Sequence, residues 1–318
     1  MAIRIALAGD TMLGRGVAER IAADPEAPLF SDEVVDAFRD ADLAVVNLEC
    51  CISSRGEPWP EPGKPFFFRA PPEAIGHLER LGIDCVALAN NHALDFGRDA
   101  LLDTFGHLEA AGIEWAGAGR GTDRARRAAI VETDGFRLAV LSVTDHPAGF
   151  AAGRDTPGVA YADLGPEVPE WLLQSISLVE ADAVLVTPHW GPNMNPEPLD
   201  YVRAAADRLV EAGATLVAGH SAHVFQGVRP PVLFDLGDFV DDYAVDPVLR
   251  NDLGLMFFVT IEGTKLTSIE AVPLKLEHGY TRLAEADDAN WIRERFASAC
   301  ETLGASVEER DGRLIARG

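Results

Sequence analysis

Short apolar runs alternate along the chain with longer segments of helical periodicity, the pattern of an α/β fold. In three places a helical segment ends at a glycine and an apolar run follows at once. Glycine suits the left-handed backbone position just past a helix end. These places span residues 78–88, 108–116 and 209–218. Their spacing is irregular, so they predict recurring helix–strand units rather than a solenoid.

Hairpin signals indicate that the sheets are mixed rather than purely parallel. Residues 128–143 read as a hairpin that turns at Asp134-Gly135, and residues 255–273 read as another around Glu262-Gly263-Thr264. A terminal helix is expected over 285–303, followed by a last hairpin over 305–316 around Asp311-Gly312.

Loops are expected where proline, glycine and asparagine gather, at 50–66, 145–160 and 190–198. None of these segments is long or polar enough to divide the chain. We therefore predict a single domain over residues 1–318. Its core would cover about residues 3–262, with the segment 263–318 packed on it.

The amino-acid composition of the chain limits the kinds of molecule that it is expected to bind. The chain has 318 residues, 47% of them hydrophobic, and a formal net charge of −24. It offers no basic face to phosphate backbones, so no nucleic-acid partner is expected. Lysine occurs only at positions 64, 265 and 275. A high-salt cytoplasm and the acidic bias of a GC-rich genome both account for such a surface, and neither bears on function.

The cysteines and the N-terminal residues give evidence on the cellular compartment in which the protein is expected. The four cysteines have no metal-ligand spacing, and the adjacent Cys50 and Cys51 cannot easily form an unstrained bridge, so free buried thiols are expected. Residues 1–9 are too short an apolar run for a signal peptide and read as a first strand. No transmembrane segment is expected. We predict a cytoplasmic protein, with peripheral membrane association left open.

The candidate site residues lie directly after the buried strands. Five apolar runs are each followed by residue types that bind metals, and sites in α/β sheets gather at the carboxyl ends of strands. The runs and their followers are Ile3–Ala8 with Gly9-Asp10, Leu43–Val46 with Asn47-Leu48-Glu49, Cys85–Ala89 with Asn90-Asn91-His92, Ala183–Thr187 with Pro188-His189-Trp190, and Leu216–Ala218 with Gly219-His220-Ser221-Ala222-His223.

Each feature taken alone has an ordinary explanation. An aspartate after a strand is usually a cap or turn residue, an Asn-Asn pair is usually a turn, and a lone histidine is usually hydrogen-bonded in a loop. Five coincidences at five strand ends favour a metal site. His77 and His107 do not follow the rule and read as helix residues, whereas His146 is a candidate for a place near the site.

The mixture of carboxylate, amide oxygen and imidazole suits two divalent cations of Mn, Fe or Zn. Two such cations, joined by a bridging carboxylate, clamp a phosphoryl group and activate water. One additional histidine could donate a proton to the leaving oxygen.

The order of motifs resembles the CapA-type capsule-biosynthesis proteins, which are associated with poly-γ-glutamate and belong to the calcineurin-like metallophosphatase superfamily. The resemblance covers about residues 3–262. It rests on Gly9-Asp10-Thr11-Met12-Leu13-Gly14-Arg15, Asn47-Leu48-Glu49, Asn90-Asn91-His92-Ala93-Leu94-Asp95-Phe96-Gly97, His189-Trp190-Gly191, Gly219-His220-Ser221-Ala222-His223 and Leu236-Gly237-Asp238-Phe239.

The resemblance implies a four-layer α/β/β/α sandwich with a dinuclear metal centre. It implies that His92 is the general acid. It also implies a place for each ligand: Asp10 and His223 at the first metal, Glu49 as the bridge, and Asn91, His189 and His220 at the second metal.

Three positions depart from the superfamily pattern. Met12 stands where the first motif usually carries a ligand histidine, and a thioether is a poor ligand for a hard cation. Glu49 stands where an aspartate is usual. The last motif is His220-x-x-His223 rather than His-x-His, so one of its two imidazoles could miss the metals.

Secondary candidates surround this set. Arg15 and Arg69 could hold an anionic substrate, although a surface ion pair is slightly favoured for Arg69. Asn90 and Trp190 are further candidates for substrate contact. Asp95 could orient His92, and Asp238 could orient a ligand histidine. The segment 117–121 resembles a phosphate cradle but lacks the Lys-Ser/Thr pair, so it reads as a loop.

Two functions remain open. The site chemistry favours a metal-dependent hydrolase of phosphate mono- or diesters. The family context favours a non-hydrolytic component of capsule assembly or export that binds metal and polyanion. Either way, the expected partner is an anionic small molecule or polymer.

Overall fold

Alternating side chains of the buried strands divide the interior into separate cores. In strand β1 (Ala2–Thr11), Ile3, Ile5 and Leu7 face one core, whereas Ala6 and Ala8 face another. The computed structural model describes residues 2–60, 63–165 and 167–318. Met1, Pro166 and residues 61–62 of the expected loop 50–66 lie outside them.

The first sheet has ten strands and is mixed, because β1 pairs parallel to β2 and antiparallel to β16. Its order is β19-β20-β17-β16-β1-β2-β5-β6, with β15 beside β1 and β18 beside β17. The strands are β2 (Leu43–Leu48), β5 (Cys85–Ala87), β6 (Glu114–Ala116), β15 (Asp238–Val240), β16 (Leu253–Glu262), β17 (Lys265–Glu277), β18 (Tyr280–Leu283), β19 (Ser306–Arg310) and β20 (Arg313–Arg317).

The second sheet has six strands in the order β13-β14-β12-β11-β9-β8. The inner strands β9, β11, β12 and β14 run parallel, and β8 and β13 are antiparallel edges. The bounds are β8 (Ala129–Thr133), β9 (Phe136–Thr144), β11 (Ala183–His189), β12 (Leu216–Ala218), β13 (Val228–Arg229) and β14 (Val232–Leu233).

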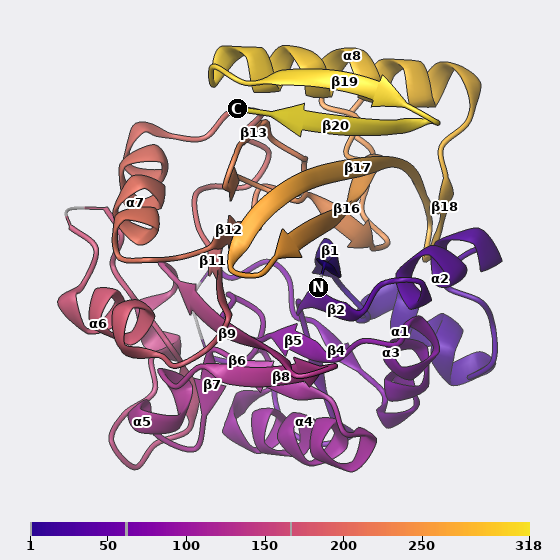
Figure 1. Ribbon diagram of the computed structural model, residues 1–318. Helices are drawn as coiled ribbons and strands as arrows, with labels where there is room; N and C mark the ends of the chain where they lie inside the picture. The colour runs from indigo at the N-terminus through magenta and orange to yellow at the C-terminus, as the bar shows by residue number, and fades with distance from the viewer. Residues whose placement is uncertain (1, 61–62, 166) are drawn as a thin grey trace.

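Helices cover the outer face of each sheet (Figure 1). Helices α1–α4 pack on the first sheet, and α6 and α7 pack on the second. The third core lies between the two sheets. This arrangement confirms the expected α/β/β/α sandwich with mixed sheets. The helices are α1 (Arg15–Ala23), α2 (Asp32–Arg39), α3 (Ile75–Leu81), α4 (Gly97–Ala111), α5 (Thr122–Ala125), α6 (Glu170–Leu178), α7 (Asp200–Glu211) and α8 (Ala286–Thr302).

The C-terminal segment is built into this frame. The hairpin β19–β20 extends the first sheet through β17, and α8 buries Ile292, Phe296 and Cys300 in the core between the sheets. Both expected hairpins of the second half, the terminal helix and the early hairpin at Asp134-Gly135 are confirmed. The division into one domain over 1–318 stays a prediction.

The expected loops contain short elements that the sequence pattern did not indicate. Within 50–66 lies strand β3 (Cys51–Ile52), which pairs with β4 (Arg69–Ala70), and within 145–160 lie a 3-10 turn at Ala148–Phe150 and β10 (Gly158–Val159), which pairs with β7 (Ala118–Gly119). Strands of two residues are too short to show a period of two, so their pairing depends on neighbours distant in the chain. The remaining short element is a 3-10 turn at Pro72–Ala74.

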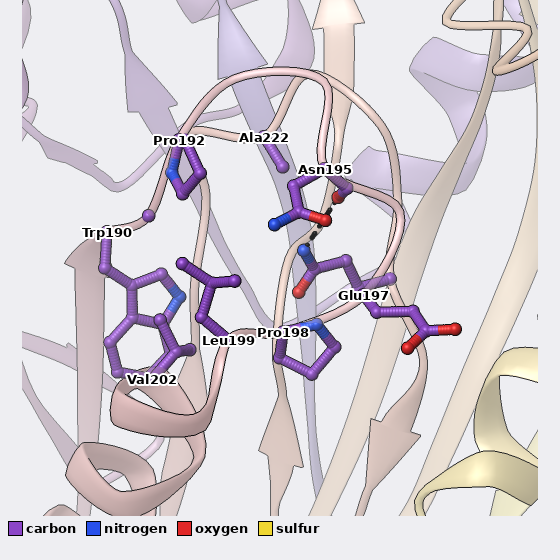
Figure 2. Close-up of a pocket in the computed structure, with 10 residues that line it drawn as sticks. Trp190, Pro192, Asn195, Glu197, Pro198, Leu199, Val202 and Ala222 are labelled. Carbon is purple, nitrogen blue, oxygen red and sulfur yellow. Dashed lines mark hydrogen bonds between the residues drawn. The ribbon is translucent and has the colours of Figure 1, made fainter.

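The loop 190–198 closes over a packed corner of the second sheet. Figure 2 shows Trp190 beside Leu199 and Val202, beneath the turn that carries Pro192 and Asn195. The cavity there encloses only about 10 Å³, which is barely the room of one water molecule. Trp190 is 2% exposed, and its Nε1 donates a hydrogen bond of 2.9 Å to the carbonyl of Phe234. This corner is part of the packing rather than a place for a substrate.

Within the residues described, no helix combines the length and the apolar character that crossing a bilayer would need. All four cysteines are buried and free, as expected.

One glycine contact fixes the centre of the first sheet. The amide of Asp10 donates to the carbonyl of Gly237 over 2.9 Å, and a Cβ on Gly9 would come within 1.9 Å of that same oxygen. Only a residue without a side chain allows β15 to lie this close to β1.

We therefore expect Gly9→Ala to lower the free energy of unfolding by roughly 1–3 kcal/mol, because the backbones must separate. Gly106→Ala is the matched control, since Gly106 lies in α4 with no atom near its missing Cβ. It should stabilise the helix by about 0.5–1 kcal/mol. Urea unfolding of both variants checks this, and a Gly9→Ala protein as stable as the wild type would contradict it.

Candidate metal centre

The carboxyl ends of the central strands of both sheets deliver their polar side chains to one place. Asp10 ends β1, Glu49 follows β2, His189 ends β11 and His220 follows β12. The two sheets meet there, because His220 Nδ1 lies 3.6 Å from Asp10 Oδ1. All of these side chains are buried.

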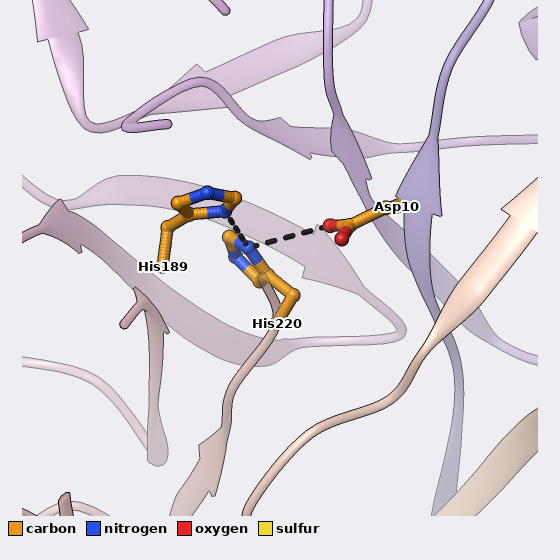
Figure 3. A group of neighbouring side chains, drawn as sticks. All are labelled: Asp10, His189 and His220. Carbon is orange, nitrogen blue, oxygen red and sulfur yellow. Dashed lines mark hydrogen bonds and ion pairs between the residues drawn. The ribbon is translucent and has the colours of Figure 1, made fainter. Parts of the chain in front are cut away.

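The first group of potential ligand atoms belongs to Asp10, His189 and His220, whose ligand atoms all lie within 4.8 Å of one another (Figure 3). His189 Nδ1 lies 2.8 Å from His220 Nδ1. The other ring nitrogen of His220 lies 3.1 Å from the hydroxyl of Thr187. That contact fixes the ring and leaves Nδ1 facing the group.

The second group combines three carboxylates and one imidazole, from Asp10, Glu49, His223 and Asp238, again within 4.8 Å of one another. His223 Nδ1 lies 2.8 Å from Asp238 Oδ1 and 3.3 Å from Asp10 Oδ2. Asp10 is the side chain that the two groups share. The resemblance gives the bridging position to Glu49, which belongs to the second group alone.

The unusual spacing of the last motif is accommodated by the backbone. Ser221 has φ 123° and His223 has φ 58°, both in the left-handed region that side chains rarely adopt. Asp235 holds this turn by accepting from the amides of Ala222 and Gly237 over 2.9 and 2.8 Å. As a result, His220 and His223 each reach one of the two groups.

Several potential ligand atoms of this cluster, and the side-chain oxygen of the expected ligand Asn91, have no hydrogen-bond partner among the described residues, although they are buried. Such atoms are destabilising unless a cation or another polar group meets them. Divalent cations fit these atoms, because their oxygen and nitrogen lone pairs are otherwise unused. The atoms are Asp10 Oδ2, Glu49 Oε1 and Oε2, Asn91 Oδ1, His189 Nε2 and Asp238 Oδ2.

Burial sets the charge of the cluster. It raises the pKa of Asp10 to about 7 and raises the pKa of Glu49 and of Asp238 well above the ordinary range. It lowers the pKa of His220 to about 3 and that of His189 well below its ordinary value. The histidines are therefore neutral at physiological pH and can act as ligands, while the carboxylates repel one another without a cation.

His92 stands beside the cluster in a fixed orientation. Its Nδ1 lies 2.6 Å from Asp95 Oδ2, which also accepts from the amide of Phe68 over 2.6 Å. The Phe68 ring stacks on the imidazole at 3.9 Å between centroids. Burial lowers the pKa of His92 to about 4. The pair with Asp95 leaves Nε2 as the nitrogen available for chemistry.

Lys64 is a part of this arrangement that the sequence analysis did not single out. Its Nζ lies 3.0 Å from Asp95 Oδ1 and donates to the carbonyl of Asn91 over 2.8 Å. It comes from the proline-rich loop and is one of only three lysines, which was the one signal available. It compensates the charge of a fully buried carboxylate.

Asn90 is occupied by internal contacts. Its Oδ1 accepts from the amide of His92, and its Nδ2 donates to Asn47 Oδ1 over 3.0 Å. Asn47 in turn donates to Asp10 Oδ1 over 2.7 Å. This amide chain ties three strand ends together, so Asn90 positions the cluster instead of offering a free group to a substrate.

The two arginine candidates have different surroundings. Arg15 is about one-third exposed, pairs with Asp242 over 3.3 Å, and lies within about 6 Å of the Phe68 and Tyr243 rings. Those rings also contact His92 and His223, so Arg15 lies at the rim of the cluster. Arg69 instead donates to the carbonyls of the 55–56 turn and lies over the Phe96 ring.

Two further residues lie near the cluster. His146 was expected only as a neighbour of the site, and Tyr243 was not expected there. His146 lies with its ring 5.3 Å from that of His189 and pairs with Asp145. The ring of Tyr243 meets His223 edge-on at 5.1 Å, and its buried hydroxyl has no partner among the described residues. A tyrosine in a loop carries no sequence signal for such a place.

Comparison with known proteins defines the family. The sequence model described as "Bacterial capsule synthesis protein PGA_cap" matches residues 4–243. The chain belongs to this family.

Relatives of this PGA_cap chain carry related names. It is 29% identical to a "Probable polyglutamine synthesis accessory protein" of Mycobacterium tuberculosis, over 98% of this chain and 95% of the relative. It is 30% identical to the PGA biosynthesis protein CapA of Bacillus subtilis, over 74% of this chain and 62% of that protein. It is 26% identical to the capsule biosynthesis protein CapA of Bacillus anthracis, over 98% and 77%.

Solved structures share the fold of this PGA_cap protein. A hypothetical protein from Thermus thermophilus superposes with a TM-score of 0.52 at 18% identity, over 86% of this chain and 99% of the other. A Staphylococcus aureus protein described as a candidate 5′-nucleotidase superposes with a TM-score of 0.53 at 14% identity, over 93% and 58%. The chain therefore shares the fold of these two proteins.

The charge of the cluster gives the PGA_cap chain a characteristic pH dependence. A carboxyl group with a raised pKa binds more protons in the folded chain, so its contribution to stability is lost as the pH rises through the folded-state pKa. The buried histidines act in the opposite sense, but above about pH 6.5 each contributes only roughly 0.4 kcal/mol, because the unfolded imidazole is already half neutral there. The carboxyl groups therefore dominate the change.

We expect the chelated protein to lose on the order of 1–3 kcal/mol of stability between about pH 6.5 and 8. Thermal unfolding in excess EDTA measures this, and the range stays below the ionisation of the buried thiols, whose pKa is also raised. Excess Mn²⁺ should remove the loss by neutralising the carboxylates. A melting temperature that rises with pH in EDTA would contradict the raised pKa values of the buried carboxyl groups.

Proposed function

We propose that this PGA_cap protein holds two divalent cations in the cluster and uses them to hydrolyse a phosphate ester during capsule or polyglutamate synthesis. The single observation that carries the proposal is the set of buried, unpartnered ligand atoms from both sheets, lying next to an oriented histidine. The names of the relatives support the biological context.

The proposed ligands are the residues that the resemblance implied. Asp10 and His223 would hold one cation, and Asn91, His189 and His220 would hold the other. Glu49 keeps the shared position that the resemblance gives it, although Asp10 is the side chain that the two groups have in common. Bound cations supply Lewis-acid stabilisation of phosphoryl oxygens and an activated water. The neighbouring residues Thr187 and Asn47 keep the ligand rings and oxygens in place through the contacts described above.

His92 is the proposed proton donor to the leaving oxygen, acting through Nε2. Its imidazole is neutral in the free protein because burial lowers its pKa to about 4. An anionic ester beside the ring would favour protonation by charge attraction. Asp95 accepts from Nδ1 and so fixes the tautomer, and Lys64 holds Asp95 in position through its contact of 3.0 Å with Oδ1.

Substrate contact is proposed for Arg15, because its guanidinium is partly exposed above the aromatic rings that line the cluster. A guanidinium forks onto phosphate or carboxylate oxygens. The substrate class is thus an anionic ester or polymer. Arg69 and Trp190 are engaged in the contacts described above, so we give them supporting roles in the loops that frame the site.

A second function is favoured by one observation, the description of a relative that spans almost the whole chain as an accessory protein. In this alternative the cluster binds cations and an anionic polymer without turnover. Met12 at the first motif is compatible with it, because a thioether is a poor ligand for a hard cation and leaves the usual ligand set of the hydrolases incomplete.

Metal content is the first test. Wild-type protein equilibrated with Mn²⁺ and then dialysed should retain about two ions per chain by elemental analysis. His189→Ala should retain about one or fewer, because an imidazole ligand is lost. His107→Ala, in the outer helix α4, is the matched control and should retain the wild-type amount. A wild-type protein without transition metal, or an unchanged His189→Ala, would contradict the metal centre.

Turnover separates the two functions. With Mn²⁺ present, the wild type should hydrolyse a chromogenic phosphodiester, and His92→Ala should be slower by roughly 10²–10⁴-fold at unchanged metal content. His107→Ala again serves as the control. If the metal-loaded wild type turns over neither mono- nor diesters, the hydrolase proposal fails and the accessory function is favoured.

A further inference from the structure

Met12, the residue at the position of a usual ligand histidine, is committed to the core. Its side chain is fully buried in the outer core of the first sheet, and its Sδ accepts from the amide of Gly14 at 3.0 Å. The cluster near Asp10 therefore receives nothing from this position. The group that compensates must come from elsewhere in the fold.

Asp238 is brought to that place by the backbone. Strand β15 runs parallel to β1, with Asp238 in register with Asp10. The close approach at Gly9 and Gly237 makes this pairing possible. The two carboxylates are consequently held side by side by two adjacent strands, which are rigid supports.

The contacts of Asp238 exceed what orientation of His223 requires. One oxygen, Oδ1, meets His223 Nδ1 at 2.8 Å, and this alone would fix the ring. The other oxygen, Oδ2, is buried without a hydrogen-bond partner among the described residues. One oxygen of Asp238 lies within 4.8 Å of ligand atoms of Asp10, Glu49 and His223, and the carboxyl group of Asp241 is a further close neighbour. Buried carboxyl groups this close together cannot all be ionised unless a cation lies between them.

We propose that Asp238 is a direct ligand of the cation held by Asp10, Glu49 and His223, and that it replaces the imidazole which Met12 does not supply. The inference rests on the proposed metal centre. It makes the two cation positions chemically unequal. One has three carboxylates and a single imidazole, and the other is dominated by His189 and His220.

Because the two cation positions have different ligands, they should prefer different metal ions. Oxygen-rich sites favour hard cations such as Mn²⁺, and imidazole-rich sites favour Zn²⁺. Protein given one equivalent of each ion per chain should therefore bind about one Zn²⁺ and one Mn²⁺, because Zn²⁺ first fills the imidazole-rich position. The Mn²⁺ bound in this way should give an electron paramagnetic resonance spectrum of a single oxygen-rich site.

The test is Asp238→Asn, because asparagine keeps an oxygen that can accept from His223 but loses the charge of a ligand carboxylate. We expect Mn²⁺ affinity to fall at least about tenfold, with Zn²⁺ affinity changed by less than about threefold. Asp84→Asn is the control. That carboxyl is partly buried, precedes β5 at the end of the sheet opposite the cluster, and accepts from the amide of Ala44 over 2.8 Å. It should lower stability yet leave the Mn-to-Zn ratio at one to one.

A double-mutant comparison separates a ligand from an orienting residue. In a His223→Ala background, Asp238→Asn should still weaken Mn²⁺ binding if the carboxylate is a ligand. It should have no further effect if Asp238 acts only through His223, and that result would overturn the inference. Wild-type Mn²⁺ affinity in Asp238→Asn would overturn it as well.

The failure of this inference is distinct from that of the proposed function. If the wild type binds two cations but hydrolyses no ester, the hydrolase proposal fails and the role of Asp238 stands. If the wild type binds two cations and Asp238→Asn binds them equally well, only the role of Asp238 fails. A wild type that binds no transition metal overturns both.

Discussion

The structure depends on the burial of like charges where the two sheets meet. Asp10, Glu49 and Asp238 are almost inaccessible to solvent and lie within ligand distance of one another, with oxygens that no described residue satisfies. Folding this sandwich without a counter-charge is unfavourable, because desolvation and mutual repulsion act in the same direction. The neutral histidines from the second sheet complete a pocket in which protons or bound cations relieve this repulsion.

The rest of the centre is organised to hold these groups against that repulsion. The amide chain from Asn90 through Asn47 to Asp10 links three strand ends, and the Gly9–Gly237 approach fixes a fourth. The left-handed turn at Ser221 and His223 aims two imidazoles at different groups. Strained backbone persists only where surrounding contacts determine it, and here Asp235 provides them.

Fold and function separate in this family. The α/β/β/α sandwich supplies strand ends at which ligands converge, but the chemistry depends on which residues occupy them. In this chain the first motif ends in a packing methionine and a later strand brings an additional carboxylate. The same frame can thus support ester hydrolysis or the binding of an anionic polymer, and relatives named as biosynthesis and accessory proteins are compatible with both.

The sequence by itself determined the fold class and most of the candidate site. Apolar periodicity identified the main strands and hairpins, because a buried strand or hairpin leaves a local pattern. The strand-end rule brought Asp10, Glu49, His189, His220 and His223 forward, since carboxyl ends of parallel strands share an edge. The tertiary structure alone decided which of them meet. Lys64, Tyr243 and the second oxygen of Asp238 reach the centre through loops and a parallel pairing far apart in the chain, and long-range packing of that kind leaves no periodic trace in a sequence.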